Sequence, residues 1–225
     1  MSLALLAPVS LPDTGPNPVA LLLLLAATSV VPFLLVAFTS FGKISVVLSL
    51  TRSALGTQQA PPTVVLTGLA AALSLVVMAP VGEAMAARLR SRPLPSVPGP
   101  ELLQAAASAA EPLRAFLLGH SSPELRAEFA ALARDSRGGT GVSDADLAVV
   151  APAFVLSELR QAFQIGFLVF LPFLVVDMVV ANVLLALGMQ SLSPSQVSLP
   201  FKVLLFVAVD GWSLLARSLV QGYGP

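Results

Sequence analysis

The sequence predicts an all-α protein of the multi-pass membrane type, with four hydrophobic helices and a small helical domain outside the membrane between the second and third. Hydrophobic residues make up 56% of the 225 residues and charged residues only 11%, and the mean hydropathy is +0.89. A soluble domain of this length rarely carries so few charges. Long uncharged runs lie towards both ends of the chain, and no alternating pattern typical of β-strands competes with them.

The composition also excludes several functions. The 12 basic and 12 acidic side chains cancel, which argues against a nucleic-acid-binding surface. Without cysteine the chain has no disulfide, thiolate metal site or cysteine nucleophile, and its one histidine, His120, stands alone in the polar part of the sequence, where we expect a surface position. No phosphate-binding glycine loop, metal-ligand cluster or nucleophile elbow is present. We therefore predict neither enzymatic activity nor a cofactor.

The first part of the chain is predicted to be a short leader followed by two hydrophobic helices. Residues 1–18 contain no Lys or Arg, unlike a cleavable signal peptide, and are interpreted as an unprocessed leader. Residues 19–87 hold the two helices. The first, residues 19–38, has 20 uncharged residues that reach about 30 Å, the thickness of one bilayer core. Pro32 is a potential kink in it, and the apolar pattern either runs on or restarts after Gly42.

The second hydrophobic helix is predicted over residues 63–81, after a polar turn at residues 51–62. Gly68 and Ala72 are four residues apart, and so are Ala70 and Ser74, a spacing of small residues that allows helices to approach closely in membranes. We therefore expect this helix to pack against another helix.

Residues 88–160 form the predicted hydrophilic domain, which is mostly helical. The segment holds eight basic and eight acidic residues, 16 of the 24 charges of the chain. It begins with a proline-rich linker at residues 91–100, and apolar residues then recur at helical spacing over residues 101–120 and 122–135. A further helix is expected to start after the capping residue Ser143.

Residues 161–225 hold the third and fourth hydrophobic helices, predicted over residues 163–187 and 203–219. On the insertion scale, the 17 Leu, Ile, Phe and Val residues of the third helix contribute roughly 5–10 kcal/mol, which exceeds the cost of about 3 kcal/mol for Asp177. The fourth helix has only nine such residues to set against Asp210, so its balance is near zero. We expect other protein to surround the fourth helix.

The polar residues in or beside the apolar runs are candidate intramembrane or assembly residues with two possible roles. They are Lys43, Asp177, Asn182, Lys202, Asp210 and Arg217. Asp210 and Arg217 are seven residues apart and would share one helix face, and Lys202 would lie roughly 80° from Asp210. These groups either pair to make burial tolerable or line a substrate or proton path. Asp177 and Asn182 similarly either make hydrogen bonds between helices or subunits or serve transport.

Charge counting does not orient the chain. Three basic residues lie on the side of the short loops, and four lie on the side of the hydrophilic domain. They are Lys43, Arg52 and Lys202 on the first side, and Arg88, Arg90, Arg92 and Arg160 on the second.

Several long motifs, in order, resemble the FliP/SctR family of type III secretion export-apparatus proteins. The most specific is "PAFVLSELRQAFQIGF" at residues 152–167, followed by "LPFLVVD" at residues 171–177. Further matches are "TSFGKISVVLSLTRSALGTQQAPP", "VVMAP" and "SLPFKVLLFVAVDGWSLLARSLVQGY". The signature positions carried over from the family are Pro152, Glu158, Phe163, Gly166, Pro172 and Asp177. The stretches "GTQQAPP" and "SPSQVSLPFK" look more like the injectisome (YscR or HrcR) branch than the flagellar one.

The resemblance implies a pore-forming core subunit of the export gate in the bacterial inner membrane. Family members assemble as five copies with four SctS-like subunits and one SctT-like subunit into a helical, conical pore, next to a SctU-like switch protein. The hydrophilic domain is expected on the periplasmic side. Unfolded effector or needle proteins are expected to pass through, and the chain itself would do no chemistry.

The resemblance also implies a pore gasket. In relatives, methionines in the loop after the third helix form a ring that seals the closed pore. Here only Met189 carries over, with Gln190 and Ser191 beside it and Leu192 as a possible helper. Met is unbranched and polarisable, so it can repack around irregular chains. The alternative is that Met189 simply packs at a helix end.

Two other interpretations of the chain remain open. It could be the flagellar homologue, or a self-contained secondary transporter with Asp177 and Asp210 on a proton path. Transporters of that kind usually show internal repeats and more spans, and neither is visible here.

Overall fold

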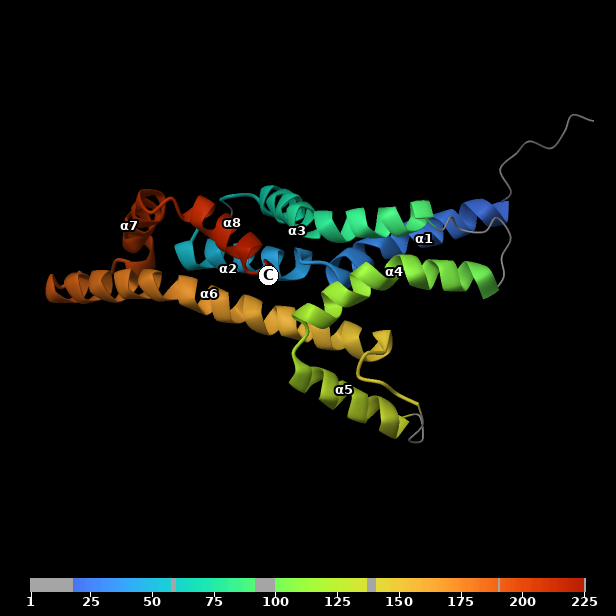
Figure 1. Cartoon of the computed structure of the whole chain (residues 1–225). Helices are drawn as coiled ribbons and strands as arrows, with labels where there is room; N and C mark the ends of the chain where they lie inside the picture. The colour runs from blue at the N-terminus through green and yellow to red at the C-terminus, as the bar shows by residue number, and fades with distance from the viewer. Residues whose placement is uncertain (1–17, 58–59, 92–99, 137–140, 190, 225) are drawn as a thin grey trace, which may run out of the picture. The chain divides into compact units, whose positions relative to one another are not determined.

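The computed structural model describes residues 18–57, 60–91, 100–136, 141–189 and 191–224, and in these ranges all regular structure is α-helical (Figure 1). The predicted all-α fold class is confirmed. The helices are α1 (Pro18–Phe38), α2 (Phe41–Leu55), α3 (Thr63–Ser91), α4 (Pro100–His120), α5 (Pro123–Ser136), α6 (Leu147–Ala186), α7 (Pro194–Ala208) and α8 (Gly211–Gln221).

The chain separates into two compact units, residues 1–34 and residues 35–225. The first unit contains most of α1, and its leader up to residue 17 lies outside the described residues. The described large apolar side chains of α1 are exposed, among them Leu22 at 66% and Phe33 at 75%. The helix continues through Pro32 to Phe38.

The length and composition of the helices confirm the multi-pass membrane type. In the described part of the chain, α3 and α6 are each long and apolar enough to cross a membrane, and the number rises to four if each bent pair of helices counts as one span. Only 22% of the most apolar stretch of α3 and 11% of that of α6 is buried. These apolar surfaces therefore face outward, towards lipid or neighbouring protein.

The predicted first helix, residues 19–38, corresponds to the undivided helix α1, whereas the predicted fourth helix is divided. Of the two possibilities near Gly42, the chain restarts as a new helix, α2, at Phe41. The predicted helix over residues 203–219 is wrong in its bounds: α7 begins already at Pro194, a residue suited to the first helical turn, and a 59° bend separates it from α8. The bend lies at Asp210, whose φ of 49° is left-handed, a conformation that Asp tolerates better than most residues.

The helix α6 joins two helices that the sequence predicted separately, the one expected after Ser143 and the third hydrophobic helix, and its N-cap is Asp146. It spans 40 residues from Leu147, so the expected boundary between the hydrophilic domain and the third helix, after residue 160, lies inside a continuous helix. Residues before that boundary bury one face of α6, including Val149, Ala153 and Phe154. Glu158 is buried on the same side, while Arg160 is exposed. A change in charge density therefore does not by itself end a helix.

The second unit is organised around α2. This helix contacts α3, α6 and α7, while α4 packs on α3 and α6, and α5 packs on α6. A Cβ atom at Gly166 of α6 would overlap the side chain of Leu50, so α2 and α6 approach closely there. The main core contains Ile44, Val47, Leu48, Ala54, Leu55, Leu66, Ala70, Ala162, Phe173, Phe206, Leu215 and Leu219. A second core, with Val77, Phe116, Leu117, Val150 and Phe154, joins α4 to α3 and α6.

Candidate functional site

A buried ion pair joins α2 to α6. The Nζ of Lys43 lies 3.2 Å from Oε1 of Glu158, and the two side chains are only 3% and 4% exposed. Lys43 also donates a hydrogen bond of 2.9 Å to Oε1 of Gln161, one turn further along α6. Buried charges of this kind are tolerated only when they are paired and hydrogen-bonded.

Tyr223, in the segment after α8, completes this cluster. Its hydroxyl donates a hydrogen bond to Oε2 of Glu158, the oxygen that Lys43 does not contact. The Lys43 Nζ also lies 3.7 Å from the centroid of the Tyr223 ring, a cation–π geometry. We call these four residues, Lys43, Glu158, Gln161 and Tyr223, the Lys43 centre.

The sequence located only part of the Lys43 centre. Lys43 was expected as a polar residue of the membrane-type region, and Glu158 as a family signature position, but nothing linked two residues that are 115 positions apart. Gln161 and Tyr223 were missed. Both lie in motifs that resemble the family, and Tyr223 is the only tyrosine of the chain, but neither signal identified their partners.

A second ion pair joins α6 to α7. Oδ2 of Asp177 lies 2.6 Å from the Nζ of Lys202, and the hydroxyl of Ser198 donates to Oδ1 of the same carboxylate. The Lys202 side chain is 5% exposed and also donates a 3.4 Å hydrogen bond to the carbonyl oxygen of Ala54 in α2. Asp177 is 30% exposed, so this pair lies closer to the surface than the Lys43 centre.

The expectation that Asp210 and Arg217 share one helix face needs correction. The left-handed backbone at Asp210 ends one helix and begins the next, so the two residues do not share a face of one continuous helix. Both are exposed, and among the described residues neither takes part in an ion pair. Lys202, which the sequence placed near Asp210, binds Asp177 instead.

The remaining predicted residues are distributed along α6. Asn182, Phe163 and Pro172 are exposed, Pro152 is partly buried inside the helix, and Gly166 is buried at the close approach to Leu50. The exposed side chains among them are available for contacts outside this chain.

The loop after α6 presents the predicted gasket residues. Met189 N–H donates to the carbonyl oxygen of Leu184 and Gly188 N–H to that of Leu185, the hydrogen-bond pattern of a Schellman motif, with Gly188 at φ 70° in the left-handed position. The motif directs the chain out of the helix, and Met189 and Leu192 are each 43% exposed. Gln190 lies outside the described residues.

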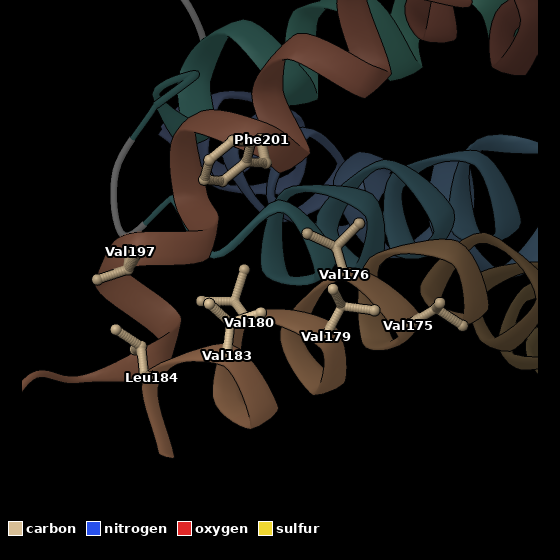
Figure 2. A pocket seen from close by; sticks show the side chains of 8 residues that line it. All are labelled: Val175, Val176, Val179, Val180, Val183, Leu184, Val197 and Phe201. Atoms are coloured by element: carbon tan, nitrogen blue, oxygen red, sulfur yellow. The ribbon is translucent and has the colours of Figure 1, made fainter. Parts of the chain in front are cut away.

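An apolar groove lies beside this loop, between the second half of α6 and α7 (Figure 2). It has a volume of about 470 Å³ and no polar atoms in its lining. The lining residues are Val175, Val176, Val179, Val180, Val183, Leu184, Val197 and Phe201.

The candidate site consists of contacts between helices and of exposed apolar surface. Within the described ranges, no group of three or more His, Asp or Glu side chains is placed to hold a metal ion. The two buried ion pairs each have a lysine on one helix and a carboxylate on another, so they fix helices relative to one another.

The comparisons with known proteins match nearly the whole chain. The FliP family profile matches residues 24–219. A protein named pathogenicity-related ORF2, from Xanthomonas campestris pv. glycines, is 44% identical, over 96% of this chain and 100% of its own length. The hypersensitivity response secretion protein HrcR of Ralstonia nicotianae is 43% identical over 91% of this chain and 96% of its own. The flagellar biosynthetic protein FliP of Bacillus subtilis is 42% identical over 94% and 95%.

Proposed function

Because this chain belongs to the FliP family, we propose that it is a pore-forming core subunit of a type III export gate in the bacterial inner membrane. The observation that carries this proposal is the match of residues 24–219 to that family, together with similarity to a secretion protein along nearly the whole length of both chains. The role is structural: the subunit conducts unfolded polypeptides and does no chemistry on them.

The exposed apolar surface of the helices supports the proposal that this chain works within an assembly rather than alone. Most of the apolar surface of α3 and α6 is uncovered in the single chain. Asn182, exposed on α6, and the apolar groove between α6 and α7 are further surfaces for contact with other subunits. We include in the proposal five copies of this chain, four SctS-like subunits, one SctT-like subunit and a SctU-like switch protein, with the hydrophilic segment of residues 88–160 on the periplasmic side.

Purification with the partner subunits tests this function. The tagged chain, expressed together with its SctS-like and SctT-like partners and extracted in mild detergent, is expected to yield one complex with a five-to-four-to-one ratio by native mass spectrometry. The physical reason is that contacts between subunits would cover apolar surface that the single chain leaves exposed. A stable monomer that transports a small solute in liposomes would contradict the proposal and favour the transporter.

Met189 and Leu192 are the proposed gasket. Both protrude from the loop after α6, where five copies would bring five thioethers and five isobutyl groups to a common axis. A flexible thioether can close around an irregular opening.

Met189→Ala is therefore expected to raise the passive leak of ions or small solutes through the closed complex severalfold. The measurement is conductance or solute uptake in membranes that hold the complex with no substrate being exported. Met178→Ala is the matched control, because Met178 is also an exposed methionine but lies within α6 and not in the loop. Equal leak in both variants, with secretion intact, would remove the gasket assignment.

The flagellar branch is the second candidate, favoured by the 42% identity to the Bacillus subtilis flagellar protein. Complementation separates the two branches. Restored effector secretion in an injectisome mutant, without restored motility in a flagellar mutant, assigns this chain to the injectisome.

A further inference from the structure

Tyr223 contacts three parts of the chain at once. Its hydroxyl and ring meet Glu158 on α6 and Lys43 on α2. The same ring stacks on Phe116 of α4, with centroids 5.9 Å apart and planes at 19°, and lies 5.1 Å from the His120 ring. One side chain therefore connects the buried ion pair with a helix of the hydrophilic segment.

The Lys43–Glu158 pair depends on Tyr223 for two interactions. Lys43 occupies Oε1 of Glu158, and Tyr223 is the donor to Oε2. The Tyr223 ring also stands against the Lys43 ammonium. Removal of this side chain would leave a buried carboxylate oxygen without its donor and open one side of the ammonium to water.

We propose that Tyr223 is a positioning residue that closes the Lys43 centre and couples it to α4. The stack on Phe116 fixes the position of the Tyr223 ring. The position of the ring in turn places the hydroxyl that donates to Glu158 and the ring face that covers the Lys43 ammonium. A displacement of α4 therefore opens the centre to water through Tyr223, although α4 itself supplies no charged group to the pair. This inference does not depend on the pore-forming role.

The two lysines of the chain provide the measurement. Lys43 and Lys202 are the only lysines, and both are buried in ion pairs. Acylation of the full-length protein in its membranes with a small amine-reactive ester, read by mass spectrometry, reports how often each amine is open. Because Lys202 pairs with Asp177, away from Tyr223, the ratio of Lys43 to Lys202 acylation separates local opening from general unfolding.

Three variants and one control define the expected pattern. Tyr223→Ala is expected to raise the acylation ratio about tenfold, because the donor and the cover are both lost. Tyr223→Phe keeps the ring and is expected to raise the ratio less. Phe116→Ala is expected to raise it as well, although Phe116 touches neither charged group. Gln221→Ala, which changes an exposed side chain of α8, should leave the ratio unchanged.

Three results would overturn the proposal. An unchanged ratio in Tyr223→Ala means that Tyr223 does not close the centre. Equal rises at Lys43 and Lys202 mean that the variant loosens the whole fold. A rise in Tyr223→Ala without one in Phe116→Ala means that the centre is not coupled to α4.

Discussion

Glu158→Ala is expected to destabilise the protein by about 3–5 kcal/mol, because it leaves the Lys43 ammonium buried without its counter-charge. Both side chains of the pair are almost fully buried, so water cannot easily replace the lost carboxylate. The Tyr223 hydroxyl loses its acceptor in the same variant. The measurement is the midpoint of denaturant unfolding in detergent micelles, together with the amount of protein in the membrane.

Two controls separate the buried charge from the loss of a side chain. Replacement of both partners, Lys43→Met with Glu158→Leu, is expected to recover much of the stability, because no unpaired charge remains. Glu111→Ala removes a carboxylate 3.7 Å from Arg114 at the surface, where both side chains are more than 40% exposed, and is expected to cost less than about 1 kcal/mol. If the double variant is as unstable as Glu158→Ala, the argument from unpaired charge fails.

Gly211→Ala is expected to destabilise the protein by about 1–3 kcal/mol through overpacking. A Cβ atom at this position would overlap the ring of Phe206. That ring is buried between Phe173, with centroids 6.2 Å apart, and Trp212, at 5.0 Å and edge-on, so it has little space to move. Thermal unfolding of the detergent-solubilised protein measures the effect.

Gly68→Ala is the matched control for this substitution. A Cβ atom at Gly68 in α3 meets nothing within 4 Å, and alanine favours a helix over glycine by about 1 kcal/mol. The temperature of thermal unfolding is therefore expected to be unchanged or slightly higher. If the two substitutions have the same effect, the close packing at Gly211 is not what makes glycine necessary there.

The hydrophobic runs predicted where helices lie better than where they end. The runs at residues 63–81 and 163–187 lie inside α3 and α6, because apolar composition reflects which residues avoid water. Composition says little about backbone continuity. It did not indicate that the helix expected after Ser143 runs without a break into the third hydrophobic helix. It also did not indicate that the chain bends at Asp210, where a left-handed residue and the close approach of Gly211 to Phe206 decide the geometry.

The sequence predicted which charged residues belong to the candidate site, but not which residues they pair with. Lys43, Asp177 and Lys202 were identified because ionisable groups are conspicuous in apolar sequence. Their partners depend on tertiary packing: Lys202 binds Asp177, 25 positions away, rather than Asp210 in the adjoining turn. Tyr223 ends one of the motifs that resemble the family, but nothing in that motif indicated that it joins the Lys43 centre.

The length of α6 lets one helix carry two separate ion pairs, one on each side of Pro172. Its 40 residues extend for about 60 Å, roughly twice the thickness of a bilayer core. Pro172 lies between the two ion pairs of the helix and removes one backbone hydrogen bond there. Glu158 ties the first half of the helix to α2, and Asp177 ties the second half to α7. These two residues are about 28 Å apart along the helix axis. A bend of α6 at Pro172 would therefore displace Met189 relative to the Lys43 centre.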